Sequence, residues 1–166
     1  AACRMNNPVL FFEHKGLYRQ GYATSKEPDE NYCLDFGSGR IAQEGSDLTI
    51  ITWGALVQKS IEASKQTNRS IEVVDLRTLY PLDLNIIIKS LEKTNRAIIV
   101  HEDNLTGGFG GEILSLINEH AFELLDAPVK RVASRDVPIA YSSNLEDQIL
   151  VQTDWIVNMI NEIIEY

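Results

Sequence analysis

The residues best suited to chemistry in this sequence are His101, Glu102 and Asp103, which follow a short apolar run at residues 97–100. An imidazole beside carboxylates can accept and donate protons, because a neighbouring carboxylate shifts the pKa of the ring. The sequence offers no evident nucleophile to complete a catalytic set. We therefore expect hydrogen bonds from these three residues to nearby loops, with acid–base chemistry as the alternative.

A glycine-rich loop follows at residues 106–111, with the sequence TGGFGG. Glycine tolerates positive φ and lets a ligand or a second chain approach the backbone closely. The spacing matches neither G-x-G-x-x-G nor G-x-x-x-x-G-K-[ST], and the loop has no lysine to contact a phosphate. The pattern therefore favours a tight turn that packs the following helix against the sheet or a neighbouring subunit.

Other candidates carry weaker signals. His14 and His120 do not combine with His101 in a spacing typical of metal ligands. Arg135 and Asp136 are adjacent, which suggests a local ion pair or a loop clamp, and an interface role is the alternative.

Alternating strands and helices must position these residues. Residues 48–53, 71–75, 97–100 and 129–132 read as strands, and residues 55–66, 84–93, 112–125 and 153–166 as amphipathic helices. Asp83 and Thr153 are the expected helix caps, residues 145–150 form a helical turn, and a stretch near 32–36 adds an edge strand. This order predicts an α/β fold with a mostly parallel sheet covered by helices on both faces.

The first 45 residues form a different region. Residues 9–12 (VLFF) are β-prone, but some thirty irregular residues follow them and leave the strand without a local partner. Loops longer than about 12–15 residues are uncommon inside a compact domain. We therefore divide the chain into an arm or linker at 1–45, which lies on another domain, and a folded domain at 46–166.

Composition limits the possible partners. The chain has 166 residues, of which 44% are hydrophobic, and a formal net charge of −9. The acidic balance disfavours nucleic acid and anionic membranes as partners. Cys3 and Cys33 form no disulfide framework or metal cluster, which favours a reducing intracellular compartment. No signal peptide is evident, and the start at Ala1 suggests a processed product or a piece of a longer protein.

Seven short strings, taken in order, resemble one protein family. They are 7–15 (NPVLFFEHK), 17–19 (LYR), 44–50 (EGSDLTI), 74–81 (VDLRTLYP), His101-Glu102 with 106–110 (TGGFG), 126–128 (DAP) and 136–138 (DVP). Each is weak alone, but the ordered set is specific and covers nearly the whole chain. The set resembles the C-terminal part of the beta subunit of thiamine-diphosphate-dependent 2-oxoacid dehydrogenases.

The resemblance implies a transketolase C-terminal domain at 46–166, a three-layer α/β/α fold with a mixed, mostly parallel sheet of about five strands. It implies that residues 1–45 are the tail end of a pyrimidine-binding domain plus a linker. The intact enzyme would use thiamine diphosphate and magnesium. The activating glutamate and the magnesium–diphosphate motif of the family lie outside this sequence. The fragment alone should therefore bind neither thiamine diphosphate nor magnesium, and it should be inactive.

The resemblance also implies partners. They are an alpha subunit, a second beta subunit and a dihydrolipoyl acyltransferase core, in the bacterial cytoplasm or the mitochondrial matrix. The 2-oxo acid would be branched-chain (2-oxoisovalerate) or pyruvate. The interface candidates are His101, Glu102, Thr106, Gly107, Gly108, Phe109, Gly110, Arg135, Asp136 and Tyr166. If the fragment dimerises, Gly110→Arg should weaken the contact.

Three alternatives stay open on the sequence. One is a free-standing protein-binding module, and another is a small dinucleotide-binding enzyme that uses the glycine loop. The third is the C-terminal piece of a transketolase or a deoxyxylulose-phosphate synthase.

Overall fold

A single five-stranded sheet forms the centre of the protein, in a computed structural model that describes residues 1–166. The strands are β1 (Arg40–Gln43), β2 (Leu48–Thr52), β3 (Ile71–Asp75), β4 (Ala97–Asn104) and β5 (Lys130–Ser134). Their order is β1-β3-β2-β4-β5, and only the β1–β3 pair is antiparallel. The expected mixed, mostly parallel sheet of about five strands is confirmed.

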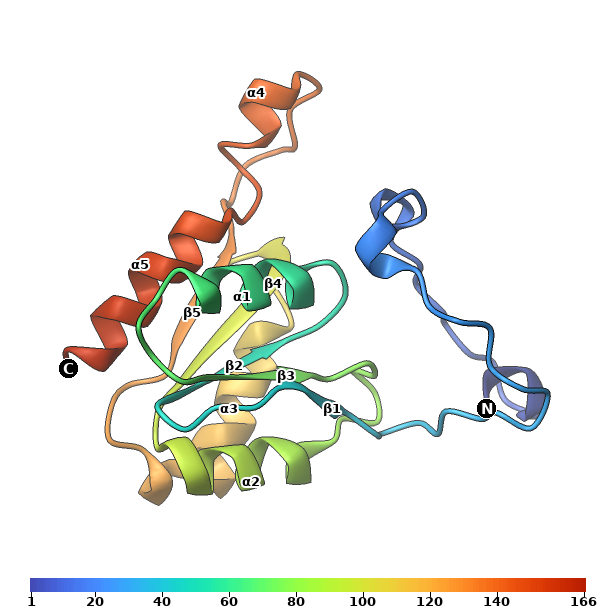
Figure 1. Cartoon of the computed structure of the whole chain (residues 1–166), viewed down its shortest axis with the longest axis horizontal. Coiled ribbons are helices and arrows are strands. Elements are labelled where there is room, and N and C mark those ends of the chain that lie inside the picture. Colours follow the sequence, from blue (N-terminus) through green and yellow to red (C-terminus); the bar gives the residue numbers. More distant parts are fainter.

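Helices cover both faces of the sheet and complete three layers (Figure 1). One face packs against α1 (Leu56–Lys65) and α5 (Thr153–Ile164), and the other against α2 (Leu84–Thr94) and α3 (Gly110–His120). The short helix α4 (Ser143–Glu146) projects away from the sheet (Figure 1). No helix combines the length and the apolar character that crossing a membrane would demand.

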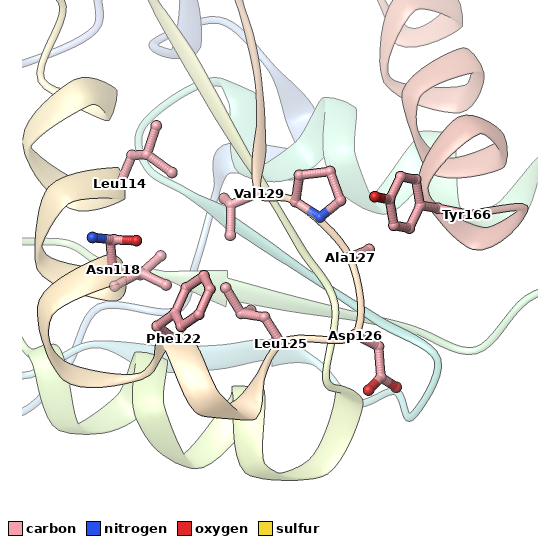
Figure 2. A pocket seen from close by; sticks show the side chains of 10 residues that line it. Leu114, Asn118, Phe122, Leu125, Asp126, Ala127, Val129 and Tyr166 are labelled. Atoms are coloured by element: carbon pink, nitrogen blue, oxygen red, sulfur yellow. The ribbon is translucent and has the colours of Figure 1, made fainter.

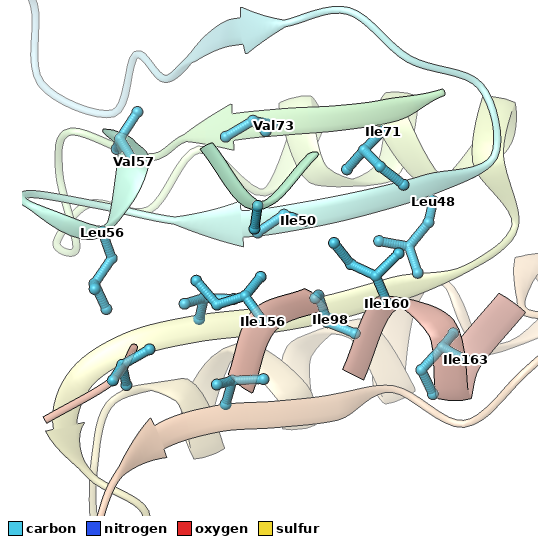
Figure 3. Close-up of a cluster of buried hydrophobic side chains, with 14 of the residues drawn as sticks. Leu48, Ile50, Leu56, Val57, Ile71, Val73, Ile98, Ile156, Ile160 and Ile163 are labelled. Carbon is cyan, nitrogen blue, oxygen red and sulfur yellow. The ribbon is translucent and has the colours of Figure 1, made fainter. Parts of the chain in front are cut away.

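The central strands are buried on both faces, which explains why they read as continuous apolar runs. Alternate residues of one strand point into different cores, because successive side chains in a strand face opposite sides. Ile98 lies in the core beneath α1 and α5, whereas Ile99 lies in the core beneath α2 and α3. Figure 3 shows the first of these cores, where Ile156 and Ile160 of α5 meet Ile50 and Ile98 of the sheet.

The carboxyl-terminal ends of β4 and α3 differ from the prediction by several residues. Strand β4 continues past Val100 to Asn104, because His101 and Asn104 pair with residues of β5. Helix α3 ends at His120 rather than at residue 125. Ala121 leaves the helical region with φ −146°, and a separate 3₁₀ turn, η4 (Phe122–Leu124), follows it.

The edge strand lies at Arg40–Gln43, so its predicted position near residues 32–36 is wrong. Ile41 and Ala42 pack against opposite cores, whereas Tyr32 and Leu34 are exposed and have nothing to pack on. The Nε of Arg40 also pairs with Oδ2 of Asp75 on β3 at 3.0 Å, which ties the edge strand to its neighbour.

The two predicted caps and the predicted helical turn have different outcomes. Asp83 is the N-cap of α2, and its Oδ1 accepts a hydrogen bond from the backbone N–H of Ile86 at 3.2 Å. Thr153 is not a cap, because it is the first helical residue of α5 and Gln152 occupies the N-cap position without a side-chain hydrogen bond. The helical turn forms as α4, two residues earlier than predicted.

Before β1, residues 1–39 of the arm contain three 3₁₀ turns, η1 (Ala2–Arg4), η2 (Lys15–Leu17) and η3 (Gly21–Ala23), and no strand. The predicted strand at residues 9–12 is therefore wrong for this chain, since it has no partner to pair with. The side chains of Phe11 and Phe12 are 76% and 87% exposed. Figure 1 shows the arm extending beyond β1, away from the sheet. The division at residue 45 stays a prediction, and β1 lies on its arm side.

Candidate functional site

The glycine loop, defined here as residues 107–111, lies between the carboxyl end of β4 and the first turn of α3. Gly107 has φ +77°, a conformation that side chains with a Cβ rarely adopt. A Cβ on Gly108 would lie 2.3 Å from the carbonyl oxygen of Asn104, and one on Gly110 would lie 2.3 Å from Cδ2 of His101. Glycine at these positions lets the loop close tightly over the imidazole.

His101 is the centre of this packing. Its side chain is 0% exposed, and its ring stacks on the Trp53 ring with centroids 5.8 Å apart and planes 2° from parallel. Phe109 meets the same indole edge-on at 6.3 Å. Neither ring nitrogen of His101 has a hydrogen-bond partner. The imidazole is thus sealed from solvent and serves here as a packing group.

The surroundings of His101 disfavour its charged form. Burial lowers its pKa below the usual value, and the positive charge of Arg131 lowers it further, while the charge and backbone of Asp103 oppose both effects. A neutral ring therefore suits the closed glycine loop, and protonation would work against the packing.

We expect the stability of the protein to fall as the pH drops below about 6.5, because unfolded His101 takes up a proton there and folded His101 resists it. The contribution of neutral His101 to stability is fully present above the pKa that the ring has in the unfolded chain. It is lost as the pH falls toward the lower pKa that the ring has in the folded protein. Urea unfolding from pH 7.5 to 5 would measure the slope. His101→Gln should flatten it, and His120→Gln, at an exposed position, should not. Equal slopes in wild type and His101→Gln would contradict the prediction.

The two carboxylates after His101 point elsewhere. The carboxylate of Glu102 meets Nε2 of His14 in the arm at 3.1 Å, and Asp103 accepts a hydrogen bond from the N–H of Asn104 at 2.8 Å. The three polar residues at the end of β4 therefore form no catalytic cluster.

Asp136 clamps the segment that leads into the glycine loop, which is one of the three roles that the sequence left open for it. Its Oδ1 accepts from the N–H of Thr106 at 2.9 Å and its Oδ2 from the Thr106 hydroxyl at 2.7 Å. These hydrogen bonds hold the pKa of the Asp136 carboxyl below its usual value. Arg135 does not pair with Asp136, because its guanidinium lies over the Trp155 ring, 5.3 Å from the centroid.

A cleft of about 790 Å³ opens beside the glycine loop. We call it the carboxyl-end cleft. It lies between the loop after β3, residues 79–82, and the start of α3, with Glu112 and Arg131 also on its wall. The Tyr80 side chain at its rim is 94% exposed. Sequence reasoning did not single out Tyr80, Glu112 or Arg131, although residues 74–81 formed one of the recognised strings.

Tyr166 lies in a second concavity, away from the glycine loop. This groove of about 410 Å³ runs between the carboxyl-terminal ends of α3 and α5. Figure 2 shows Leu114, Phe122, Leu125 and Val129 on one side and Tyr166 across from them. The predicted interface residues are therefore divided between the carboxyl-end region and this groove.

The residues present do not fit a magnesium–diphosphate site. No group of three or more His, Cys, Asp or Glu side chains is arranged to hold a metal ion. The space behind Gly108 and Gly110 is filled by the His101 ring, so the glycine loop offers no open cradle for a phosphate. The geometry instead provides a closed loop, an apolar cleft and exposed aromatic side chains, which suits contact with another protein surface.

Known proteins resemble this chain over most of its length. Residues 37–156 match the family described as transketolase, C-terminal domain. The chain is 40% identical to the mitochondrial pyruvate dehydrogenase E1 component subunit beta of Dictyostelium discoideum, over 95% of this chain and 46% of that one. It is 38% identical to the 2-oxoisovalerate dehydrogenase subunit beta of Bacillus subtilis (strain 168), over 100% of this chain and 51% of that one.

Among solved structures, a split gene transketolase described as an inactive beta4 tetramer superposes with a TM-score of 0.70. The match covers 85% of this chain and 46% of that one, at 22% identity, and so supports the fold alone. The chain spans about half the length of the curated relatives that it matches.

Proposed function

Because the chain belongs to the transketolase C-terminal domain family, we propose that it is the C-terminal assembly domain of the beta subunit of a 2-oxoacid dehydrogenase. The observation that carries this proposal is the continuous match to beta subunits, at 37–40% identity over 95–100% of the chain. A match of that extent includes the arm as well as the folded domain. It supports a shared architecture across both regions.

The surfaces of the chain support a role in assembly. Large apolar side chains are exposed in three separate places: the arm, the segment from Val137 to Leu145, and the rim of the carboxyl-end cleft. Exposed apolar groups that gather in this way mark surfaces that other proteins cover. We infer that the alpha subunit, a second beta subunit and the dihydrolipoyl acyltransferase core are those proteins.

The intact enzyme would decarboxylate a 2-oxo acid with thiamine diphosphate and magnesium and pass the acyl group to a lipoyl arm. The 2-oxo acid would be pyruvate or a branched-chain 2-oxo acid, since relatives named for each match this chain to a similar degree. The chain by itself would supply contacts rather than catalytic groups. The sealed His101 and the diverging carboxylates of Glu102 and Asp103 support this part of the proposal.

A chimera tests this proposal. The matching half of the Bacillus subtilis 2-oxoisovalerate dehydrogenase subunit beta would be replaced by this chain and co-expressed with its alpha subunit. We expect the chimera to co-purify with the alpha subunit and to decarboxylate 2-oxoisovalerate. The beta subunit lacking its C-terminal half is the control and should do neither.

A folded chimera that captures no alpha subunit would overturn the proposal and would favour a free-standing binding module. Circular dichroism and a cooperative thermal transition would establish that the chimera is folded before its assembly is judged.

A further inference from the structure

We propose that two arginines and the first turn of α1 form a binding site for a phosphate group at the carboxyl end of β3. The site consists of Arg40 at the start of β1, Arg77 in the loop after β3, and the backbone N–H groups at the start of α1. We call it the arginine site. It is separate from the carboxyl-end cleft, whose walls contain none of these groups. It goes beyond the proposed role in assembly, because it assigns a ligand to the chain itself.

The first observation is the strained backbone of Arg77. Its φ is +57°, in the left-handed region that residues with a Cβ rarely adopt. The other non-glycine residue with positive φ is Asn95, which is the C-cap of α2, a position where this conformation is common. The N–H of Arg77 donates to Oδ1 of Asp75 at 3.2 Å, and this hydrogen bond helps to hold the strained turn.

The Arg77 side chain makes no polar contact within the chain that would explain this strain. It is exposed, and its guanidinium forms neither an ion pair nor a hydrogen bond with another residue. Glycine would adopt the same conformation without strain. Strained residues gather where side chains contact ligands, so we place the partner of Arg77 outside the chain.

The second observation is a neighbouring guanidinium with free donors. Arg40 pairs with Asp75 in the strand register, and its Nε donates to Oδ2 of Asp75 at 3.0 Å. The Arg40 side chain is still 52% exposed, and its two Nη groups have no partner. The buried carboxylate of Asp75 thus anchors Arg40 through one oxygen and the Arg77 backbone through the other. Two positive charges face one negative charge here, which favours an oxyanion that accepts from both arginines.

The third observation is the open start of α1 beside these arginines. Thr52 pairs with Asp75 in the sheet, and the chain then turns at Gly54 into α1. No side chain caps this helix, and Gly54 has φ +62° with no atom within 4 Å of a Cβ built there. Free N–H groups and the helix dipole favour a bound anion at such a start.

A buried hydroxyl at the same place also lacks a partner. Oγ1 of Thr52 is inaccessible to solvent and forms no hydrogen bond. Leu48 and Ile50 lie in the core beneath α1 and α5, and alternation along β2 directs Thr52 to that same side. An unpaired buried hydroxyl is costly, and an oxyanion at the start of α1 would supply an acceptor for it.

The experiment is isothermal titration of the 166-residue chain with inorganic phosphate, at constant ionic strength with chloride as the reference anion. Phosphate at about ten times its dissociation constant should raise the thermal midpoint by about 3–5 °C. Arg77→Gln and Arg40→Gln should each raise the dissociation constant by at least about tenfold, because each removes a charged hydrogen bond. Arg69→Gln is the matched control and should bind as wild type does, since Arg69 is exposed at the opposite end of β3.

Arg77→Gly separates loss of the ligand contact from loss of the fold. Glycine relieves the left-handed strain, so the thermal midpoint of the ligand-free variant should rise by about 2–4 °C. Phosphate binding should be lost in the same variant. In NMR spectra, phosphate should shift the backbone amide signals of Gly54 and Leu56 in the wild-type chain and leave them unshifted in Arg77→Gly.

Phenyl phosphate and pyruvate distinguish the possible ligands. Binding of phenyl phosphate as well as inorganic phosphate would identify phosphate esters as ligands, and binding of inorganic phosphate alone would restrict the site to the free ion. Three outcomes would overturn the inference: no saturable binding of phosphate, tighter binding of pyruvate than of phosphate, or wild-type affinity in Arg77→Gln. Failure of the proposed function is seen separately, because capture of the alpha subunit by the chimera does not depend on phosphate.

Discussion

Replacing Gly110 by alanine lowers the free energy of unfolding by about 2–3 kcal/mol, as expected for overpacking in a closed site. The added Cβ would lie 2.3 Å from Cδ2 and 2.4 Å from Nε2 of His101. The imidazole has little room to move aside, because it is fully buried and the Trp53 ring stacks on it. Either α3 or the end of β4 must then shift.

The neighbouring glycine provides the matched control. A Cβ on Gly111 would meet only Nη1 of Arg131, at 3.4 Å, which is ordinary contact. Gly111→Ala should therefore leave stability unchanged or raise it by up to about 1 kcal/mol, because alanine favours helix more than glycine does. Urea unfolding monitored by circular dichroism compares the two variants directly.

A second variant identifies the cause of the Gly110 effect. His101→Ala removes the ring that the new methyl group would strike, so Gly110→Ala should cost less in that background than in wild type. If Gly110→Ala costs the same in both backgrounds, the clash with His101 is not the cause. The same geometry means that Gly110→Arg, suggested by the sequence as a probe of association, would disturb the buried packing instead.

Replacing Lys93 by methionine costs about 3 kcal/mol of stability, at the lower end for a broken buried ion pair because the Lys93 ammonium is partly exposed. The variant leaves the carboxylate of Glu72 on β3 without its ion-pair partner, and the Glu72 side chain is only 1% exposed. Its carboxylate also accepts from the Ser90 hydroxyl and, at 3.4 Å, from the backbone N–H of Gly45, so these two hydrogen bonds persist while the charge loses its counter-ion.

Two further variants separate charge from packing. Glu44→Gln removes the other partner of Lys93, a pair at 2.9 Å in which Glu44 is exposed, and should change stability little. Glu72→Gln combined with Lys93→Met leaves no unpaired charge and should recover most of the loss. A Lys93→Met variant as stable as wild type would show that water reaches Glu72 and compensates for the missing ammonium.

A glycine-rich loop between a strand and a helix can have more than one structural role. Glycines between a strand and a helix often make room for a ligand. Here the His101 ring occupies the space next to Gly108 and Gly110, and the outer surface of the loop forms part of the carboxyl-end cleft. The loop therefore packs α3 against His101 on its inner side and lines the carboxyl-end cleft on its outer side.

Local patterns in the sequence were sufficient to predict most helices and strands of the folded domain. Apolar runs and helical spacing are properties of neighbouring residues, so β2, β3 and α2 lie close to where they were predicted. The Asp83 cap of α2 was predictable for the same reason, because a cap acts within three residues of itself. The ordered strings, in turn, were sufficient to identify the family.

Only the tertiary structure decided the roles of the polar residues at the end of β4. The burial of His101 depends on Trp53, which lies 48 positions earlier in the chain. The direction of the Glu102 side chain depends on His14, which lies 88 positions earlier. The meeting of Glu112 and Arg131 on the wall of one cleft likewise depends on where α3 and β5 lie in the fold. Such contacts form because the fold brings distant strands, helices and loops together. The spacing of residues along the chain does not predict them.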